Sequence, residues 1–168
     1  YASLMNSVFK DFKVKVFGGL IMEPYAGGIN PKNLEALMKY SYGDFDKVFK
    51  FVSFPTHHTQ FVAKQEKRTD EYIASCFSLY DSQKVNKDVL TILDLIAYNK
   101  LVLNTGHLSD EETINLIHLA KNHGVTKILV PANHLAKKTL IEINSLTKVF
   151  FEFSYFFISE ATGIPLTH

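Results

Sequence analysis

Short apolar runs rich in β-branched and aromatic residues alternate along the chain with stretches in which apolar residues recur at helical spacing. This alternation predicts βα units arranged around a mainly parallel sheet. The polar stretch 60–72 lacks a persistent period, so we expect it to be a surface connection or a place where chain is missing from the sequence. Strands are expected near residues 14–22, 48–54, 74–80, 101–104, 126–130 and 149–157.

Helix boundaries are marked more sharply than strand boundaries. In GGINPKNLEALMKY, Pro31 stands at the first position of an expected helix that ends near Tyr40, where the missing N–H of proline costs nothing. In HLSDEETINLIHLAKNHG, Ser109 and Glu112 have the spacing of a capping box, and Gly124 supplies the stop. A third helix, with one apolar face, is expected over residues 87–98.

Composition narrows the class of protein. The 168 residues, 46% of them hydrophobic, suffice for one core, so residues 1–168 are expected to form a single domain. The 18 basic and 17 acidic residues nearly cancel, which disfavours nucleic acid and anionic membranes as partners. The apolar run 149–158 is too short to span a bilayer and is expected to be a buried strand. The single cysteine, Cys76, is expected to be a small core residue within a strand, in a cytoplasmic protein.

Histidines follow three of the expected strands, which lead directly into PTHH, TGH and PANH. Because the C-terminal ends of parallel strands line one edge, His57 or His58 should share a face with His107 and His134. Converging imidazoles are typical ligands of a divalent metal, and zinc is the first expectation, with manganese and iron as alternatives. For each histidine taken alone, the alternative is a loop side chain that bonds to backbone.

A hydrolytic metal site also needs a carboxylate, as a ligand or as the base that takes a proton from water. Glu152 is the main candidate, because strand alternation places it on the face opposite its phenylalanine neighbours. That face belongs either to a functional interior or to a solvated side of the sheet. Glu23 is a weaker candidate, and Asp81 equally fits the start of a turn. The glycines of GGLIMEPYAGGIN match no phosphate-binding motif and are expected to form turns.

The run KDVLTILDLIAYNKLVLNTGHLSDEETINLIHLAKNHGVTKILV, with GGINP and FPT upstream, resembles an uncharacterised group of amidohydrolase-like, metal-dependent hydrolases. The resemblance covers most of residues 14–155 and is most specific in TGHLSDEE. It implies a TIM-type β/α barrel with a metal site at its C-terminal mouth, and it supports His107 best. Such proteins have Thr-His-Pro where this chain has PANH, so His134 is offset from the histidine of that motif. They also have a longer spacing between Pro-Thr and a histidine than PTHHTQF has, so His57 and His58 remain alternatives.

The first-strand His-x-His and closing Asp that are usual in such proteins do not occur in this sequence. A complete barrel typically needs ~250 residues, so an incomplete or partly represented barrel is expected. The resemblance implies hydrolysis, by metal-activated water, of a small molecule with an amide, ester, lactone or cyclic C–N bond. The alternative is a non-catalytic barrel-like module for binding or assembly, whose exposed edges would favour homo-oligomers. A third hypothesis is a metal-free barrel that binds phosphate at the helix start beside Ser109.

Overall fold

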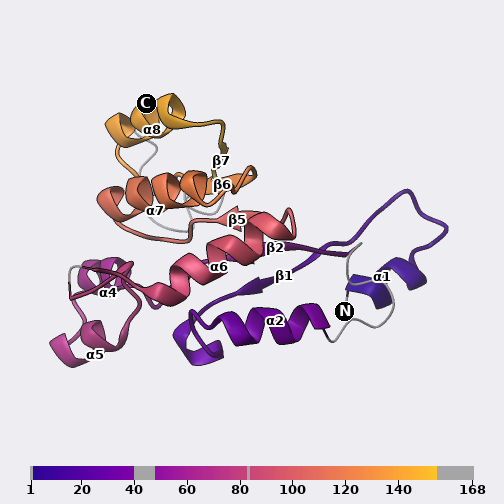
Figure 1. Ribbon diagram of the computed structural model, residues 1–168, viewed down its shortest axis with the longest axis horizontal. Coiled ribbons are helices and arrows are strands. Elements are labelled where there is room, and N and C mark those ends of the chain that lie inside the picture. Colours follow the sequence, from indigo (N-terminus) through magenta and orange to yellow (C-terminus); the bar gives the residue numbers. More distant parts are fainter. Residues whose placement is uncertain (1, 40–47, 83, 155–168) are drawn as a thin grey trace.

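The computed structural model describes residues 2–39, 48–82 and 84–154. It shows an α/β fold with a five-stranded parallel sheet, in the strand order β1-β2-β5-β6-β7, and with helices between the strands (Figure 1). A separate two-stranded sheet pairs β3 with β4 antiparallel. The elements are α1 (Ala2–Val8), β1 (Gly18–Ile21), η1 (Pro24–Ala26), α2 (Pro31–Lys39), β2 (Phe49–Ser53), α4 (Gln60–Gln65), α5 (Asp70–Ser75), β3 (Tyr80–Asp81), β4 (Lys84–Val85), α6 (Lys87–Tyr98), β5 (Val102–Asn104), α7 (Asp110–Asn122), β6 (Ile128–Pro131), α8 (Lys137–Leu146) and β7 (Phe150–Glu152).

The strand order of the main sheet follows the order of the chain, without a reversal among the described strands. The helices pack on one another in the same sequence, because α2 contacts α6, α6 contacts α7 and α7 contacts α8. Helices in such continuous contact lie on one face of a sheet, so the other face carries none of these four. A doubly wound sheet differs, because its strand order reverses and helices cover both faces.

The core lies between the sheet and these helices. Leu20, Val52, Leu103 and Ile128 stand in register on four neighbouring strands, which places them on the same face. Of these, Val52, Leu103 and Ile128 are at most 2% exposed. The apolar face of α6 covers this row with fully buried side chains, namely Val89, Ile92, Leu93 and Ile96.

The opposite face of the sheet has a different character. Ile21, Ser53, Asn104, Leu129 and Phe150 stand in register across it. The polar side chains in the middle are buried, whereas the apolar side chains of the edge strands are open, with Ile21 49% and Phe150 61% exposed. This face is therefore apolar at both edges and is not covered by α2, α6, α7 or α8.

The start of α7 fixes the position of the neighbouring helix α8. Ser109 and Glu112 form the predicted capping box, with each side chain bonded to the backbone N–H of the other residue. The N-cap of α8, Ala136, has no side-chain cap of its own. Asp110 replaces it, because its carboxylate accepts hydrogen bonds from the Ala136 N–H at 3.4 Å and from the Thr139 hydroxyl at 2.6 Å.

Three expectations about the chain between residues 60 and 80 are corrected. The stretch 60–72 is not an irregular connection, because α4 and the start of α5 occupy it. Thr59 and Thr69 cap these helices by accepting hydrogen bonds from backbone N–H groups. The expected strand over 74–80 is wrong, because α5 continues to Ser75 and only Tyr80 enters a strand. Cys76 is buried as predicted, but it follows a helix rather than lying in a strand.

The apolar run near the C-terminus is also corrected within its described part. A strand forms there, but it covers only Phe150–Glu152 and lies at the edge of the sheet. Phe150 and Phe153 are each more than 60% exposed, so this part is not a buried strand. Residues 155–158 of the run lie outside the described residues, as does Tyr40, where the first helix was expected to end. Among the described helices, none has the length and apolar character needed to cross a membrane.

Candidate functional site

The C-terminal ends of the parallel strands meet at one edge of the sheet, and the segments that follow them carry the candidate residues. Glu23 follows β1, the PTHH segment follows β2, the TGH segment follows β5 and the PANH segment follows β6. Glu152 is the last residue of β7. The topology therefore brings the predicted residues to the same edge, and the contacts below decide which of them meet.

A glycine turn places His107. Gly106 has a φ of +70°, and a Cβ atom built on it would lie 2.3 Å from the Pro55 carbonyl oxygen, so only glycine fits. The Asn104 side chain holds the turn by accepting a hydrogen bond from the Gly106 N–H. The His107 backbone is fixed on both sides, because its N–H donates to Pro55 and its carbonyl accepts from the Thr59 hydroxyl at 2.8 Å. His107 is thus anchored to the loop after β2.

His107 and His134 form a pair. Their ring centroids lie 5.0 Å apart with an angle of 55° between the ring planes. The Nε2 atom of His134 lies 3.0 Å from the Leu108 carbonyl oxygen, and the Phe61 ring centroid lies 5.7 Å from that of His134. The prediction that these two strand-end histidines lie together is therefore confirmed.

Both imidazoles of this pair favour the neutral form. Burial is the largest cause that lowers the pKa of His107, and the charge of His57 lowers it further. A backbone hydrogen bond with Thr56 and the charges of Glu152 and Glu23 oppose this shift only in part. Burial also lowers the pKa of His134, and the neighbouring His107 adds to the effect. Neutral imidazoles keep a nitrogen lone pair, which is the form that binds metal.

Glu23 ties the end of β1 to the loop after β2. Its Oε1 accepts hydrogen bonds from the Thr56 N–H at 2.7 Å, the Thr56 hydroxyl at 2.9 Å and the His57 N–H at 2.9 Å. Its Oε2 accepts from the His58 N–H at 3.1 Å and lies 3.2 Å from His58 Nδ1. Burial alone would raise the Glu23 pKa, but these donors outweigh it and lower the pKa from 4.5 to about 2. Glu23 is an ionised anchor for this loop.

The two histidines of PTHH have different surroundings. His58 is held against Glu23, with the Tyr25 ring edge-on at 4.6 Å. The His57 side chain is 81% exposed, and its charge acts on His107. Of the two alternatives left open by the sequence, His57 is the one whose charge affects the His107 pKa.

Three further residues considered from the sequence are Glu152, Asp81 and Cys76. Glu152 is exposed on the same face of the sheet as Phe150, and its charge raises the pKa of His107. Asp81 lies in the β3–β4 hairpin, where the Ser82 hydroxyl donates to it, so its turn role is supported. Burial raises the pKa of the Cys76 thiol, which disfavours the nucleophilic thiolate.

The described histidines and carboxylates do not form a complete set of metal ligands. No group of three or more His, Cys, Asp or Glu side chains in the described ranges stands close enough to hold an ion. His107 and His134 supply a fitting pair, whereas a zinc site takes at least three protein ligands. The pair thus fits part of a metal site, and a further ligand must join it.

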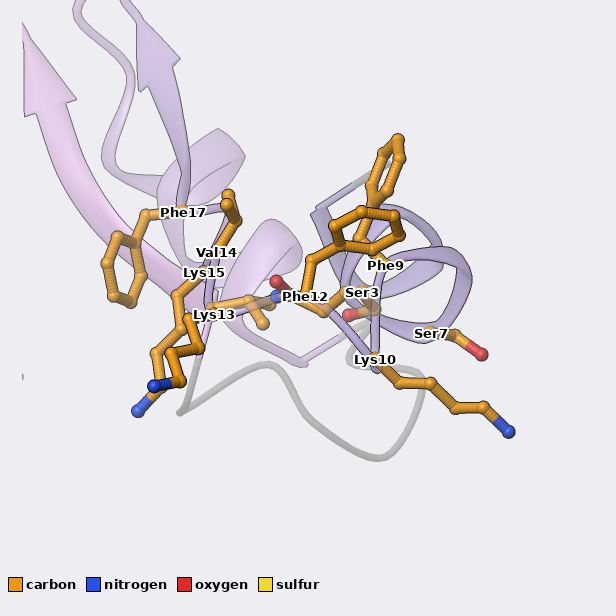
Figure 2. Close-up of a pocket in the computed structure, with 11 residues that line it drawn as sticks. Ser3, Ser7, Phe9, Lys10, Phe12, Lys13, Val14, Lys15 and Phe17 are labelled. Atoms are coloured by element: carbon orange, nitrogen blue, oxygen red, sulfur yellow. The ribbon is translucent and has the colours of Figure 1, made fainter.

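A separate cleft lies at the other end of the strands. It has a volume of about 1150 Å³ and lies between α1 and the segment that leads into β1 (Figure 2). Phe9, Phe12 and Phe17 line it together with Lys13 and Lys15, whose side chains point the same way in Figure 2. Because these residues precede β1, the cleft is remote from the strand-end histidines. Asn6 holds α1 to this segment through two hydrogen bonds with the Val16 backbone.

Fold and site together define a parallel α/β protein with histidine-bearing loops at the C-terminal edge of its sheet. The model of a family of unknown function, DUF6282, matches residues 1–152, and the chain belongs to this family. The searches of curated proteins and of solved structures found no match.

Proposed function

We propose that this chain is part of a TIM-type β/α barrel and that its C-terminal edge binds a divalent metal ion for hydrolysis. Strand order supports the barrel, because each parallel strand of the main sheet lies next to its successor and the helices share one face. The face opposite these helices supports it as well. In a barrel, its row of Ile21, Leu129 and Phe150 would face the interior instead of solvent.

The observation that carries the metal proposal is the His107–His134 pair, with centroids 5.0 Å apart and both pKa values lowered. His57 is the third ligand in this proposal. Its ring is exposed, and its charge acts on His107. His58 is the less suitable alternative, because it is held against Glu23 and Tyr25. Zinc is the first expectation for such imidazole ligands, with manganese or iron next.

When bound, a divalent ion supplies Lewis acidity and activates water for attack on a carbonyl or phosphoryl group. The protein contributes the fixed imidazoles and a proton acceptor. Glu152 is that acceptor in this proposal, because it stands exposed at the end of β7 and its charge reaches His107. The substrate class, a small molecule with an amide, ester, lactone or cyclic C–N bond, rests on the resemblance to amidohydrolase-like proteins.

Metal titration of the purified protein tests this proposal. We expect Zn²⁺ and Co²⁺ to bind with a stoichiometry near one in calorimetry, and His107→Ala and His134→Ala each to abolish binding. His118→Ala is the matched control, because His118 is exposed on α7 and should leave binding unchanged. Binding that survives both His107→Ala and His134→Ala would overturn the assignment. Hydrolysis of chromogenic esters, amides and lactones is then compared between the loaded protein and Glu152→Gln.

The second candidate is a non-catalytic module for binding or assembly. Two observations favour it: the described residues form no complete ligand set, and the edge strands leave Ile21 and Phe150 exposed. Exposed apolar edges promote self-association. A protein that binds neither Zn²⁺ nor Co²⁺, and that forms homo-oligomers weakened by Phe150→Ser in sedimentation analysis, would favour this candidate over the hydrolase.

A further inference from the structure

The loop after β2 contains a hydrogen-bonded chain whose proton positions follow from counting donors. The Thr56 hydroxyl donates its single proton to Glu23, since an ionised carboxylate only accepts. The same hydroxyl oxygen lies 3.0 Å from His57 Nδ1. With its proton already committed, the hydroxyl must accept, so His57 carries its proton on Nδ1. His57 Nε2 then keeps the lone pair.

The tautomer of His58 follows from a single contact. Its Nδ1 lies 3.2 Å from Glu23 Oε2, which cannot donate. The His58 proton therefore also lies on Nδ1, and the Nε2 atom keeps the lone pair. One carboxylate thus sets the tautomer of two adjacent histidines, that of His58 directly and that of His57 through the Thr56 hydroxyl.

We propose that Glu23 is a positioning residue that holds His57 and His58 in the Nδ1–H tautomer, so that the proposed ligand His57 presents Nε2 as its metal-binding nitrogen. The metal-binding part of this proposal rests on the proposed function, whereas the tautomers do not. A carboxylate behind a metal-binding histidine is a recurrent arrangement that fixes the ring and raises its basicity. It also explains why Glu23 is not itself a ligand, because both of its oxygens already accept from the 56–58 loop.

Nuclear magnetic resonance of ¹⁵N-histidine-labelled protein tests the tautomers, because the two ring nitrogens have distinct shifts when one is protonated. In the metal-free protein we expect the Nδ1–H pattern for both His57 and His58, assigned from His57→Ala and His58→Ala. Thr56→Val keeps the backbone N–H but removes the hydroxyl, so it should change only the His57 pattern. Glu23→Gln should change both.

The control variant is Asp94→Asn. Asp94 faces His123 Nδ1 at 2.6 Å on the protein surface, so its replacement should change the His123 pattern and leave His57 and His58 as they are. An unchanged His134 signal reports that each variant keeps its fold. An Nε2–H pattern at His57 and His58 in the wild-type protein, or a His57 pattern indifferent to Thr56→Val, would overturn the proposal.

Metal affinity separates this proposal from the proposed function. Loss of a carboxylate or hydroxyl partner behind a ligand typically weakens metal binding ~10–100-fold. If His57 is the third ligand, Thr56→Val should weaken Co²⁺ binding by such a factor, whereas Asp94→Asn should not. A wild-type protein with the expected tautomers but no Co²⁺ binding would refute the metal site and keep Glu23 as the residue that sets both rings.

Discussion

His107 and His134 come from successive βα units, and their ring centroids lie 5.0 Å apart at the C-terminal edge of the sheet. The two rings are held by different means. The His107 backbone is bonded to Pro55 and Thr59, whereas His134 is held through its own Nε2 by the Leu108 carbonyl. The loop after β2 therefore places the His107 backbone, whereas the loop after β5 places the His134 ring.

The first prediction concerns the protonation of this pair. The pKa values of both rings lie below 6.5 because of burial, and the His107 charge lowers that of His134 further. Titration of the Cε1 protons by nuclear magnetic resonance should give midpoints below 6.5 for both residues. His107→Ala should raise the His134 midpoint, and Glu152→Gln should lower the His107 midpoint. Midpoints at or above 6.5 for both rings in the wild type would contradict the arrangement.

The pair also predicts how stability depends on pH. A histidine whose pKa is lowered by folding binds protons more readily in the unfolded chain, so acid favours unfolding. The stability contributed by His107 and His134 is present above pH 6.5 and is lost as the pH falls below that value. Urea denaturation between pH 7.5 and 5.5 should show this loss. In the double variant His107→Ala/His134→Ala the loss should be smaller.

The second prediction concerns Glu23, whose pKa falls from 4.5 to about 2 on folding. A carboxylate with a lowered pKa stabilises the folded state above pH 4.5, and this contribution is lost as the pH falls from 4.5 toward 2. The shift corresponds to about 3 kcal/mol at neutral pH, for a side chain that is 17% exposed. Glu23→Gln should therefore flatten the acid part of the stability profile measured by denaturation.

The matched control for Glu23 is Glu66→Gln. Glu66 pairs with Arg68 at 2.8 Å, but both side chains are about half exposed. Solvent screens such a pair, so the substitution should change the stability by less than ~1 kcal/mol. An equal effect of the two substitutions would show that Glu23 does not anchor the loop after β2.

The third prediction concerns Gly106. Alanine there would adopt a positive φ, which costs ~1–2 kcal/mol, and its Cβ would press against the Pro55 backbone. We expect Gly106→Ala to destabilise the protein by ~3 kcal/mol or more and to displace His107. Gly28→Ala is the control, because Gly28 also has a positive φ but the nearest atom to its Cβ would lie 3.7 Å away. It should cost only ~1 kcal/mol in thermal or chemical denaturation.

The fourth prediction concerns the joint between α7 and α8. Asp110→Ala removes the acceptor for the Ala136 N–H and the Thr139 hydroxyl, so α8 loses its N-terminal cap. The expected loss is ~1–2 kcal/mol, with faster amide exchange in the first turn of α8. Glu111→Ala is the control. Glu111 is exposed in the same first turn of α7, and its interaction with the helix dipole is worth only ~0.5 kcal/mol. Equal exchange rates in the two variants would argue against the role of Asp110.

Elements with local signals could be predicted from the sequence, and elements that depend on distant residues could not. The α7 start was predicted because Ser109 and Glu112 lie three positions apart and form their cap locally. The α8 helix was missed because its cap comes from Asp110, 26 positions before Ala136. The short helices α4 and α5 were missed although Thr59 and Thr69 offered capping signals, because six residues are too few to show an apolar period.

The candidate site shows the same difference between features with a signal in the sequence and features that depend on distant residues. Topology alone predicted that His107 and His134 would share an edge, because residues after successive parallel strands converge. The role of Glu23 was not predicted, because its partners lie 33 to 35 positions away and become visible only when the loop after β2 is placed. The distinction between His57 and His58 also depends on that loop, since the two residues are adjacent in sequence and differ only in what surrounds them.

The unreversed strand order has a consequence for how this protein folds. Each new strand of the main sheet adds to the edge that its predecessor left, so the sheet can grow in the direction in which the ribosome delivers the chain. The pairings join residues from 21 positions apart, Leu129 and Phe150, to 51 positions apart, Phe51 and Val102, and the entropy of loop closure rises only slowly over this range. The histidine pair is completed only when β6 docks on β5, so the chemistry proposed for this edge would arise after β1, β2 and β5 have paired.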